Sequence, residues 1–178
     1  ILLDDKADTL KYEITKKNEK YAFNVNLNID QNPFNISFLN YSKDKKIKSS
    51  MLIDFFYNKD DKIKFNKISF NENNNNILIK DLILNDRYKV LDFQLIDLNY
   101  KNNNKIKNKI FIKKSKDIYI VNGKSFDISK MINKLIDENN DSSIFNDFSS
   151  KFKVKVDKVY LDQTSFVNQF KLSKIRYL

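Results

Sequence analysis

The chain has 178 residues, the size of one domain, and a formal net charge of +10 from 33 Lys and Arg against 23 Asp and Glu. It contains no His and no Cys, which excludes the commonest general base, the usual zinc sites and disulfides. Its single glycine also excludes the glycine-rich loops that bind phosphates. We therefore expect a protein that is not an enzyme and that carries no cofactor or metal.

The positive charge is made almost entirely of lysine. Arg87 and Arg176 are the only arginines, although Arg is the usual residue for bidentate contacts to phosphates and bases. The abundance of Lys, Asn, Ile, Phe and Tyr is typical of an AT-rich genome. We interpret the lysines as a scattered, solvated face and do not expect nucleic acid as a partner.

Apolar and polar residues alternate along most of the chain, beginning at 10–14. In the next segment Phe23, Val25 and Leu27 alternate with Asn24 and Asn26. Side chains of a β-strand alternate between its two faces, so this pattern predicts strands with one apolar face. Further strands are predicted at 34–38, 51–57, 63–70, 77–84, 90–98, 106–112 and 118–121. Within 63–70 the apolar residues change once from odd-numbered to even-numbered positions, which indicates a β-bulge.

The connections between these strands are short and rich in Asn, Asp and Lys. Asn and Asp tolerate the left-handed backbone conformation, so they can form turns where glycine is scarce. Short connections predict an antiparallel meander, because parallel strands need a long crossover.

One stretch has helical spacing. Apolar residues at 128, 131, 132, 135 and 136 predict a short helix near 127–138, with Asp127 at its start. Gly123 is expected in a turn just before this helix. Alternation resumes at 152 and predicts at least two more strands.

These elements predict a single module, 1–178, of the mainly β fold class. It consists of a meander (1–122), a turn and helix (123–139) and C-terminal strands (151–178). The predicted helix has too little apolar surface to cover eight or more strands, so something else must cover the apolar face of the sheet. Two interpretations stay open: an ordinary closed core, or a trough that holds acyl chains. In the second case we expect lipid contacts from Phe23, Val25, Leu27, Phe93 and Leu95.

The last third of the chain contains three short motifs in sequence. They are Gly123, Phe126 and Asp127, then Phe152, Val154, Val156, Asp157, Val159 and Leu161, then Asn168 and Phe170. This series resembles the repeat module of the AsmA-like superfamily, specifically its YhdP-type proteins. Those modules have a glycine, phenylalanine and aspartate entering a helix, then an alternating strand with an internal aspartate, then an asparagine followed by an aromatic residue. Lys171 stands where those modules have a glycine.

The resemblance implies a long curled, groove-like sheet (a β-taco) that conducts phospholipids from the inner to the outer membrane of Gram-negative bacteria. It implies a periplasmic module of a longer protein, anchored in the inner membrane through a segment outside this one, and a start at Ile1 agrees with such a piece. The implied partners are phospholipid acyl chains, neighbouring modules of the same chain and the membrane. The alternatives are a closed β-sandwich acting as an extracytoplasmic interaction or adhesion module, and lysine-driven binding of nucleic acid or an anionic membrane.

Overall fold

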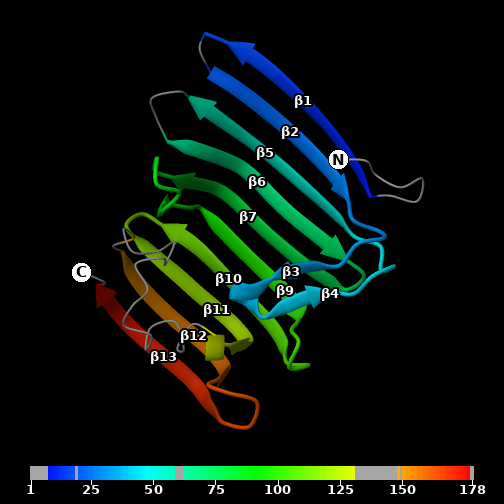
Figure 1. Cartoon of the computed structure of the whole chain (residues 1–178). Coiled ribbons are helices and arrows are strands. Elements are labelled where there is room, and N and C mark those ends of the chain that lie inside the picture. Colours follow the sequence, from blue (N-terminus) through cyan, green and yellow to red (C-terminus); the bar gives the residue numbers. More distant parts are fainter. Residues whose placement is uncertain (1–7, 19, 59–61, 131–147, 149, 177–178) are drawn as a thin grey trace.

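The computed structural model describes residues 8–18, 20–58, 62–130, 148 and 150–176. Within these residues the chain is mainly β. Eleven strands form one large, mostly antiparallel sheet that is not closed into a barrel (Figure 1). The predicted fold class is confirmed.

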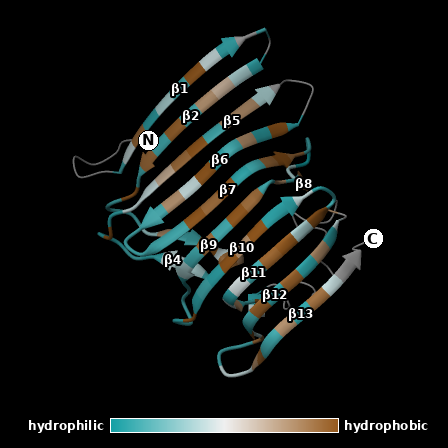
Figure 2. Ribbon diagram, turned by 180° about the vertical axis from the view of Figure 1, so that it is seen from behind, coloured by the Kyte–Doolittle hydropathy of each residue, from teal (hydrophilic) through white to brown (hydrophobic). Residues whose placement is uncertain are grey.

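The strands of the large sheet follow one another in space nearly as they do in sequence. The order across the sheet is β1-β2-β5-β6-β7-β9-β10-β11-β12-β13, with β8 paired to the end of β7. Their bounds are β1 Thr9–Lys17, β2 Lys20–Asn28, β5 Ser50–Asn58, β6 Ile63–Glu72, β7 Asn75–Leu84, β8 Val90–Asp92, β9 Leu95–Lys101, β10 Lys107–Ser115, β11 Ile118–Asp127, β12 Lys151–Tyr160 and β13 Phe166–Arg176. Figure 2, coloured by hydropathy, shows hydrophobic and hydrophilic residues alternating along these strands.

A small insertion between β2 and β5 lies over one face of the large sheet. It consists of β3 (Phe34–Ile36), the 3-10 helix η1 (Ser37–Leu39) and β4 (Tyr41–Lys43), and we call residues 34–43 the flap. The strand predicted at 34–38 is therefore shorter than expected. The chain reverses through η1 and Asn40, whose φ of 50° is left-handed.

Asparagine takes the place of glycine at several turns, as predicted. Asn18 lies between β1 and β2, and Asn73 lies between β6 and β7; their φ values are 47° and 48°. Asn is one of the few side chains that visits this region at low cost.

One neighbouring pair of strands departs from the predicted antiparallel meander. β11 and β12 are parallel, and the connection 128–150 is longer than the dozen or so residues that such a crossover needs. The backbone of Ser129 and Lys130 is helical, and the Ser129 N–H donates to the Asp127 carboxylate at 3.0 Å. The rest of the helix predicted near 127–138 lies outside the described residues. No helix in the described part of the chain is long and apolar enough to cross a membrane.

The expectation that Gly123 forms a turn is wrong, because Gly123 lies within β11. The register between β10 and β11 shifts here, because Lys109 pairs with Ser125 whereas Ile110 pairs with Gly123. Lys124 is therefore the extra residue of a β-bulge. A Cβ at Gly123 would overlap the Ile110 side chain and lie 2.8 Å from the Lys109 carbonyl oxygen. Glycine is needed for this close approach of two strands.

The bulge predicted within 63–70 is confirmed. Phe55 of β5 pairs with Phe65 of β6, whereas Asp54 pairs with Lys67, so Asn66 is the extra residue. The bulge keeps apolar residues on one face although their parity in the sequence changes.

Candidate functional site: the apolar face of the sheet

Two continuous rows of side chains cross ten strands on one face of the sheet. Row 1 is Leu10, Leu27, Met51, Phe70, Ile77, Leu98, Ile110, Gly123, Val156 and Phe170. Row 2 is Tyr12, Val25, Ile53, Ile68, Ile79, Ile96, Ile112, Val121, Val154 and Leu172. Apart from the Tyr12 hydroxyl and the bare Gly123 position, these rows are entirely apolar.

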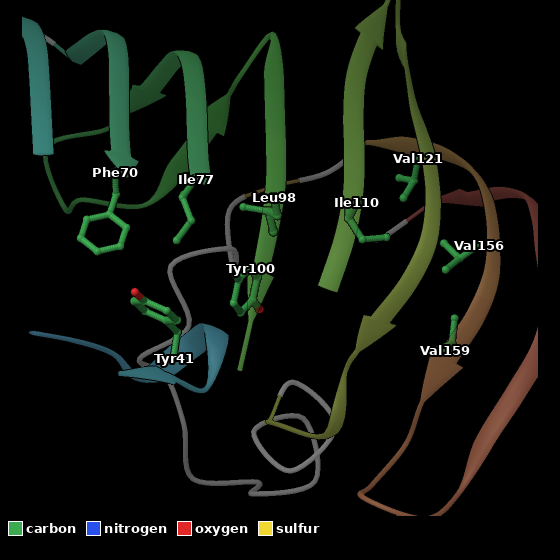
Figure 3. Packing of buried hydrophobic residues seen from close by; sticks show 9 residues of the cluster. All are labelled: Tyr41, Phe70, Ile77, Leu98, Tyr100, Ile110, Val121, Val156 and Val159. Atoms are coloured by element: carbon green, nitrogen blue, oxygen red, sulfur yellow. The ribbon is translucent and has the colours of Figure 1, made fainter. Parts of the chain in front are cut away.

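The flap covers the middle of this face. Phe34 stacks on Phe70 with ring centres 5.2 Å apart, and Tyr41 meets the edges of Phe70 and Tyr100 at 5.6 and 5.8 Å. Figure 3 shows the buried side chains of the sheet strands converging on one interior, with Tyr41 entering it from the flap. The middle of the face is therefore an ordinary closed core.

Hydrogen bonds connect the flap to the ends of the strands beneath it. The Tyr41 hydroxyl donates to the buried Glu72 carboxylate. The Tyr100 hydroxyl donates to the Leu39 carbonyl at 3.0 Å, and the Asn103 N–H donates to the Asn40 carbonyl at 2.8 Å. Burial, together with the Glu72 carboxylate, raises the pKa of Tyr41, so its hydroxyl stays protonated and can donate.

A second closed cluster lies over β8 to β12. Phe93 is only 2% exposed and packs on Tyr119 and Phe148, with ring centres 4.5 and 5.5 Å away. Phe93 was expected to contact lipid, but it is packed in a buried aromatic cluster and has almost no surface to offer a ligand.

The face is open over β1, β2 and β5. We call this region the N-terminal apolar strip. It consists of Leu10, Tyr12, Ile14, Phe23, Val25, Leu27, Met51, Ile53 and Phe55. Leu10, Tyr12 and Ile14 are 53%, 67% and 51% exposed, and the strip residues of β2 and β5 are half-buried. Phe23 and Phe55 stack almost parallel, 4.5 Å apart at 3°. Three predicted lipid contacts, Phe23, Val25 and Leu27, thus lie side by side on an open apolar surface.

Leu95 does not share that surface. It pairs with Lys80 and Lys113 on the opposite face, because Ile96 and Leu98 are the residues of β9 that face the core. The run 90–98 was predicted as one strand, but it breaks between β8 and β9 at Phe93 and Gln94.

The residues that resemble the family motif are dispersed and have structural surroundings. Gly123 lies beside the bulge at Lys124, and Phe126 packs against the larger core. Phe170 lies in row 1. The exposed members are Asp157, Leu161 (40% exposed) and Asn168.

Asp127 is a motif residue that several hydrogen bonds hold in place. It is buried, and its carboxylate accepts from the amides of Asn102 at 2.6 Å and Asn104 at 3.3 Å, while its N–H donates to Asn108 at 2.7 Å. Asp127 therefore ties the β9–β10 loop to the start of the crossover.

A charged cluster that sequence reasoning missed lies beside the second core. Lys114 is 2.5 Å from the Asp92 carboxylate, which also accepts from the Tyr119 hydroxyl. Burial acts to raise the pKa of Asp92, but the bonds from Lys114 and Tyr119 outweigh it and hold this pKa below its ordinary value. These residues line an open depression of about 520 Å³. Lys114 and Tyr119 are 22 and 27 positions away from Asp92 in the sequence, so no local pattern indicates this cluster.

In the described part of the chain, no group of three or more carboxylates is placed to hold a metal ion.

Comparison of the chain with protein-family models, with curated proteins and with solved structures found no match.

Proposed function

We propose that this chain is a non-enzymatic lipid-binding module in which the N-terminal apolar strip shields phospholipid acyl chains. The observation that carries the proposal is the contrast along rows 1 and 2. Both rows are closed over in the middle of the sheet, yet they continue without a polar break onto β2 and β1, where the same apolar face is open.

Covering the exposed side chains of this strip removes apolar surface from water, which is favourable. Fully burying a Leu or Ile side chain contributes about 1.5–3 kcal/mol. Leu10, Tyr12 and Ile14 are each at least half exposed, so covering these three alone would contribute about 2–4 kcal/mol. Large contiguous apolar patches are rare on soluble monomers and often mark a binding site.

The resemblance to YhdP-type proteins of the AsmA-like superfamily supports phospholipid as the ligand. By the same resemblance we place the module in the periplasm, within a longer inner-membrane-anchored protein that conducts lipid towards the outer membrane. β1 and β13 are the outermost strands of the described sheet. Strand edges need protection, and neighbouring modules of the same chain would supply it.

The alternative is a closed β-sandwich acting as an interaction module. It would need a second sheet over β1, β2 and β5. In the described residues the second sheet is the two-stranded one of the flap, which packs on the middle of the large sheet.

The test compares two double variants of β1. Leu10→Gln with Ile14→Gln makes the strip polar, whereas Lys11→Gln with Glu13→Gln changes residues of the same strand whose side chains lie on the opposite face. All four side chains are exposed, so both variants should fold, and the control pair leaves the net charge unchanged. We expect the first variant to lose about tenfold in affinity for a fluorescent acyl probe, since it removes two apolar contacts, and the control to match the unaltered protein. Equal affinities in all three proteins would refute the proposal.

A further inference from the structure

The N-terminal apolar strip ends in polar groups on the same face. Beyond Ile14, Phe23 and Phe55, the next row across β1, β2 and β5 is Lys16, Tyr21 and Tyr57. The Lys16 Nζ lies 5.4 Å from the centre of the Tyr21 ring. Lys16 is exposed, Tyr57 is 37% exposed and Tyr21 is half-buried. An ammonium group and two phenol rings therefore stand at the end of the strip where β1 turns into β2.

A carboxylate lies at the opposite end of the strip. Asp8 directly precedes β1, and its carboxylate accepts from the Gln31 N–H and the Asn32 amide, each at 2.7 Å. Partial burial acts to raise the pKa of Asp8, but these hydrogen bonds outweigh it and lower the pKa, so the group is ionised at neutral pH. An amphiphile with an anionic head is thus repelled at the Asp8 end and attracted at the Lys16 end.

The strip is long enough for one acyl chain. Tyr21 and Leu27 are six residues apart on β2, which is about 20 Å at roughly 3.4 Å per residue. Half of a bilayer's hydrocarbon core is about 15 Å. Lys16 lies eight residues after Asp8, which directly precedes β1, so a chain laid along β1 and β2 with its head at Lys16 would end before Asp8.

We propose that Lys16, with the hydroxyls of Tyr21 and Tyr57, binds the phosphate-bearing headgroup of an anionic lipid whose acyl chain lies on the N-terminal apolar strip. This inference rests on the proposed function and adds the polarity and orientation of the ligand. A lysine ammonium binds phosphate as a point charge with strong, charge-assisted hydrogen bonds. Tyrosine suits the boundary between an apolar surface and water because its ring is apolar and its hydroxyl is polar.

The test measures how two amphiphiles displace a neutral fluorescent lipid from the whole chain. The amphiphiles are a long-chain alkyl phosphate and the alcohol of the same chain length, so they share the tail and differ in the head. We expect the unaltered protein to bind the phosphate about tenfold more tightly than the alcohol, a ratio typical of one charge-assisted contact. Lys16→Gln should bring that ratio close to one without changing the affinity for the alcohol. Tyr21→Phe with Tyr57→Phe should lower it in part.

Lys11→Gln is the matched control, because it removes one lysine from β1 on the face away from the strip. The inference is overturned if Lys11→Gln lowers the ratio as much as Lys16→Gln, or if the unaltered protein binds both amphiphiles equally. It is also overturned if inorganic phosphate alone competes as well as the alkyl phosphate, since the site would then be a simple anion site. Equal binding of both amphiphiles leaves the proposed function intact, whereas no binding of either refutes both proposals.

Discussion

Replacing Gly123 by alanine tests the bulge that sets the register of the C-terminal strands. The added methyl would overlap the Ile110 side chain and lie 2.8 Å from the Lys109 carbonyl oxygen. Ile110 is 2% exposed and has little room to move, and the carbonyl belongs to the paired strand. Overpacking of this kind costs about 1–3 kcal/mol, and the lower backbone entropy of alanine offsets about 0.5–1 kcal/mol. Because the added methyl would lie closer than 3.0 Å to both groups, the upper part of the overpacking range applies, and we expect a net loss of about 1–2 kcal/mol.

The assay is thermal and urea unfolding followed by far-ultraviolet circular dichroism. For a chain of this length, the expected loss lowers the melting temperature by about 2–8 °C. Adding Ile110→Val removes the atom that meets the new methyl but not the Lys109 carbonyl. The double variant should therefore lose about 0.5–1 kcal/mol less than the sum of the two single losses. If Gly123→Ala is as stable as the unaltered protein, the two strands do not approach as described.

Three further changes test the flap, the crossover and the charged cluster. Tyr41→Phe removes the hydroxyl that donates to the buried Glu72 carboxylate; we expect a loss of about 1–3 kcal/mol and faster amide exchange across residues 34–43. Asp127→Asn weakens the hydrogen bonds from the Asn102 and Asn104 amides, so the free energy of unfolding should fall by about 1–2 kcal/mol. The same change at the exposed Asp157 should have no measurable effect. Because the pKa of Asp92 lies below its ordinary value of 3.8, its contribution to stability is present above about pH 4 and is lost as the pH falls through the folded pKa. Asp92→Asn should therefore flatten the decline of the urea midpoint between about pH 5 and pH 2, and an unchanged acid profile would count against this ion pair.

The strands were predictable wherever apolar side chains occupy one face and polar side chains the other, which gives a period of two. Phe23, Val25 and Leu27 show this, and so does the change of parity at Asn66, because a bulge is needed to keep apolar side chains on one face. Asparagine turns were predictable for a local reason, since the left-handed conformation at Asn18 and Asn73 depends on the residue itself.

Features that depend on partners distant in the sequence were not predictable. A lone glycine is typical of a turn, and only the close approach of Ile110 on the neighbouring strand explains why a glycine stands at position 123 within β11. Leu95 lies in an apolar run, and only the break after β8 turns it to the opposite face. β4 has no apolar alternation, so the hydrogen bond from Tyr41 to Glu72 could not be foreseen.

The candidate site was predictable in part. Alternation identified an apolar face and three residues of the N-terminal apolar strip, but a period of two looks the same in a closed core and in an open trough. Phe93 shows the difficulty, because it is an apolar residue like Phe23 and yet lies in a buried cluster. The extent of the opening depends on where the flap packs, which is a long-range contact.

The central claim is that lipid occupies the N-terminal apolar strip, and native mass spectrometry of the purified chain tests it most directly. We predict adducts with the masses of phospholipids that survive gentle desolvation. They should persist in the Lys11→Gln, Glu13→Gln variant and be strongly reduced in the Leu10→Gln, Ile14→Gln variant. A chain that emerges free of lipid, and that stays free after incubation with phospholipid vesicles, would contradict the account.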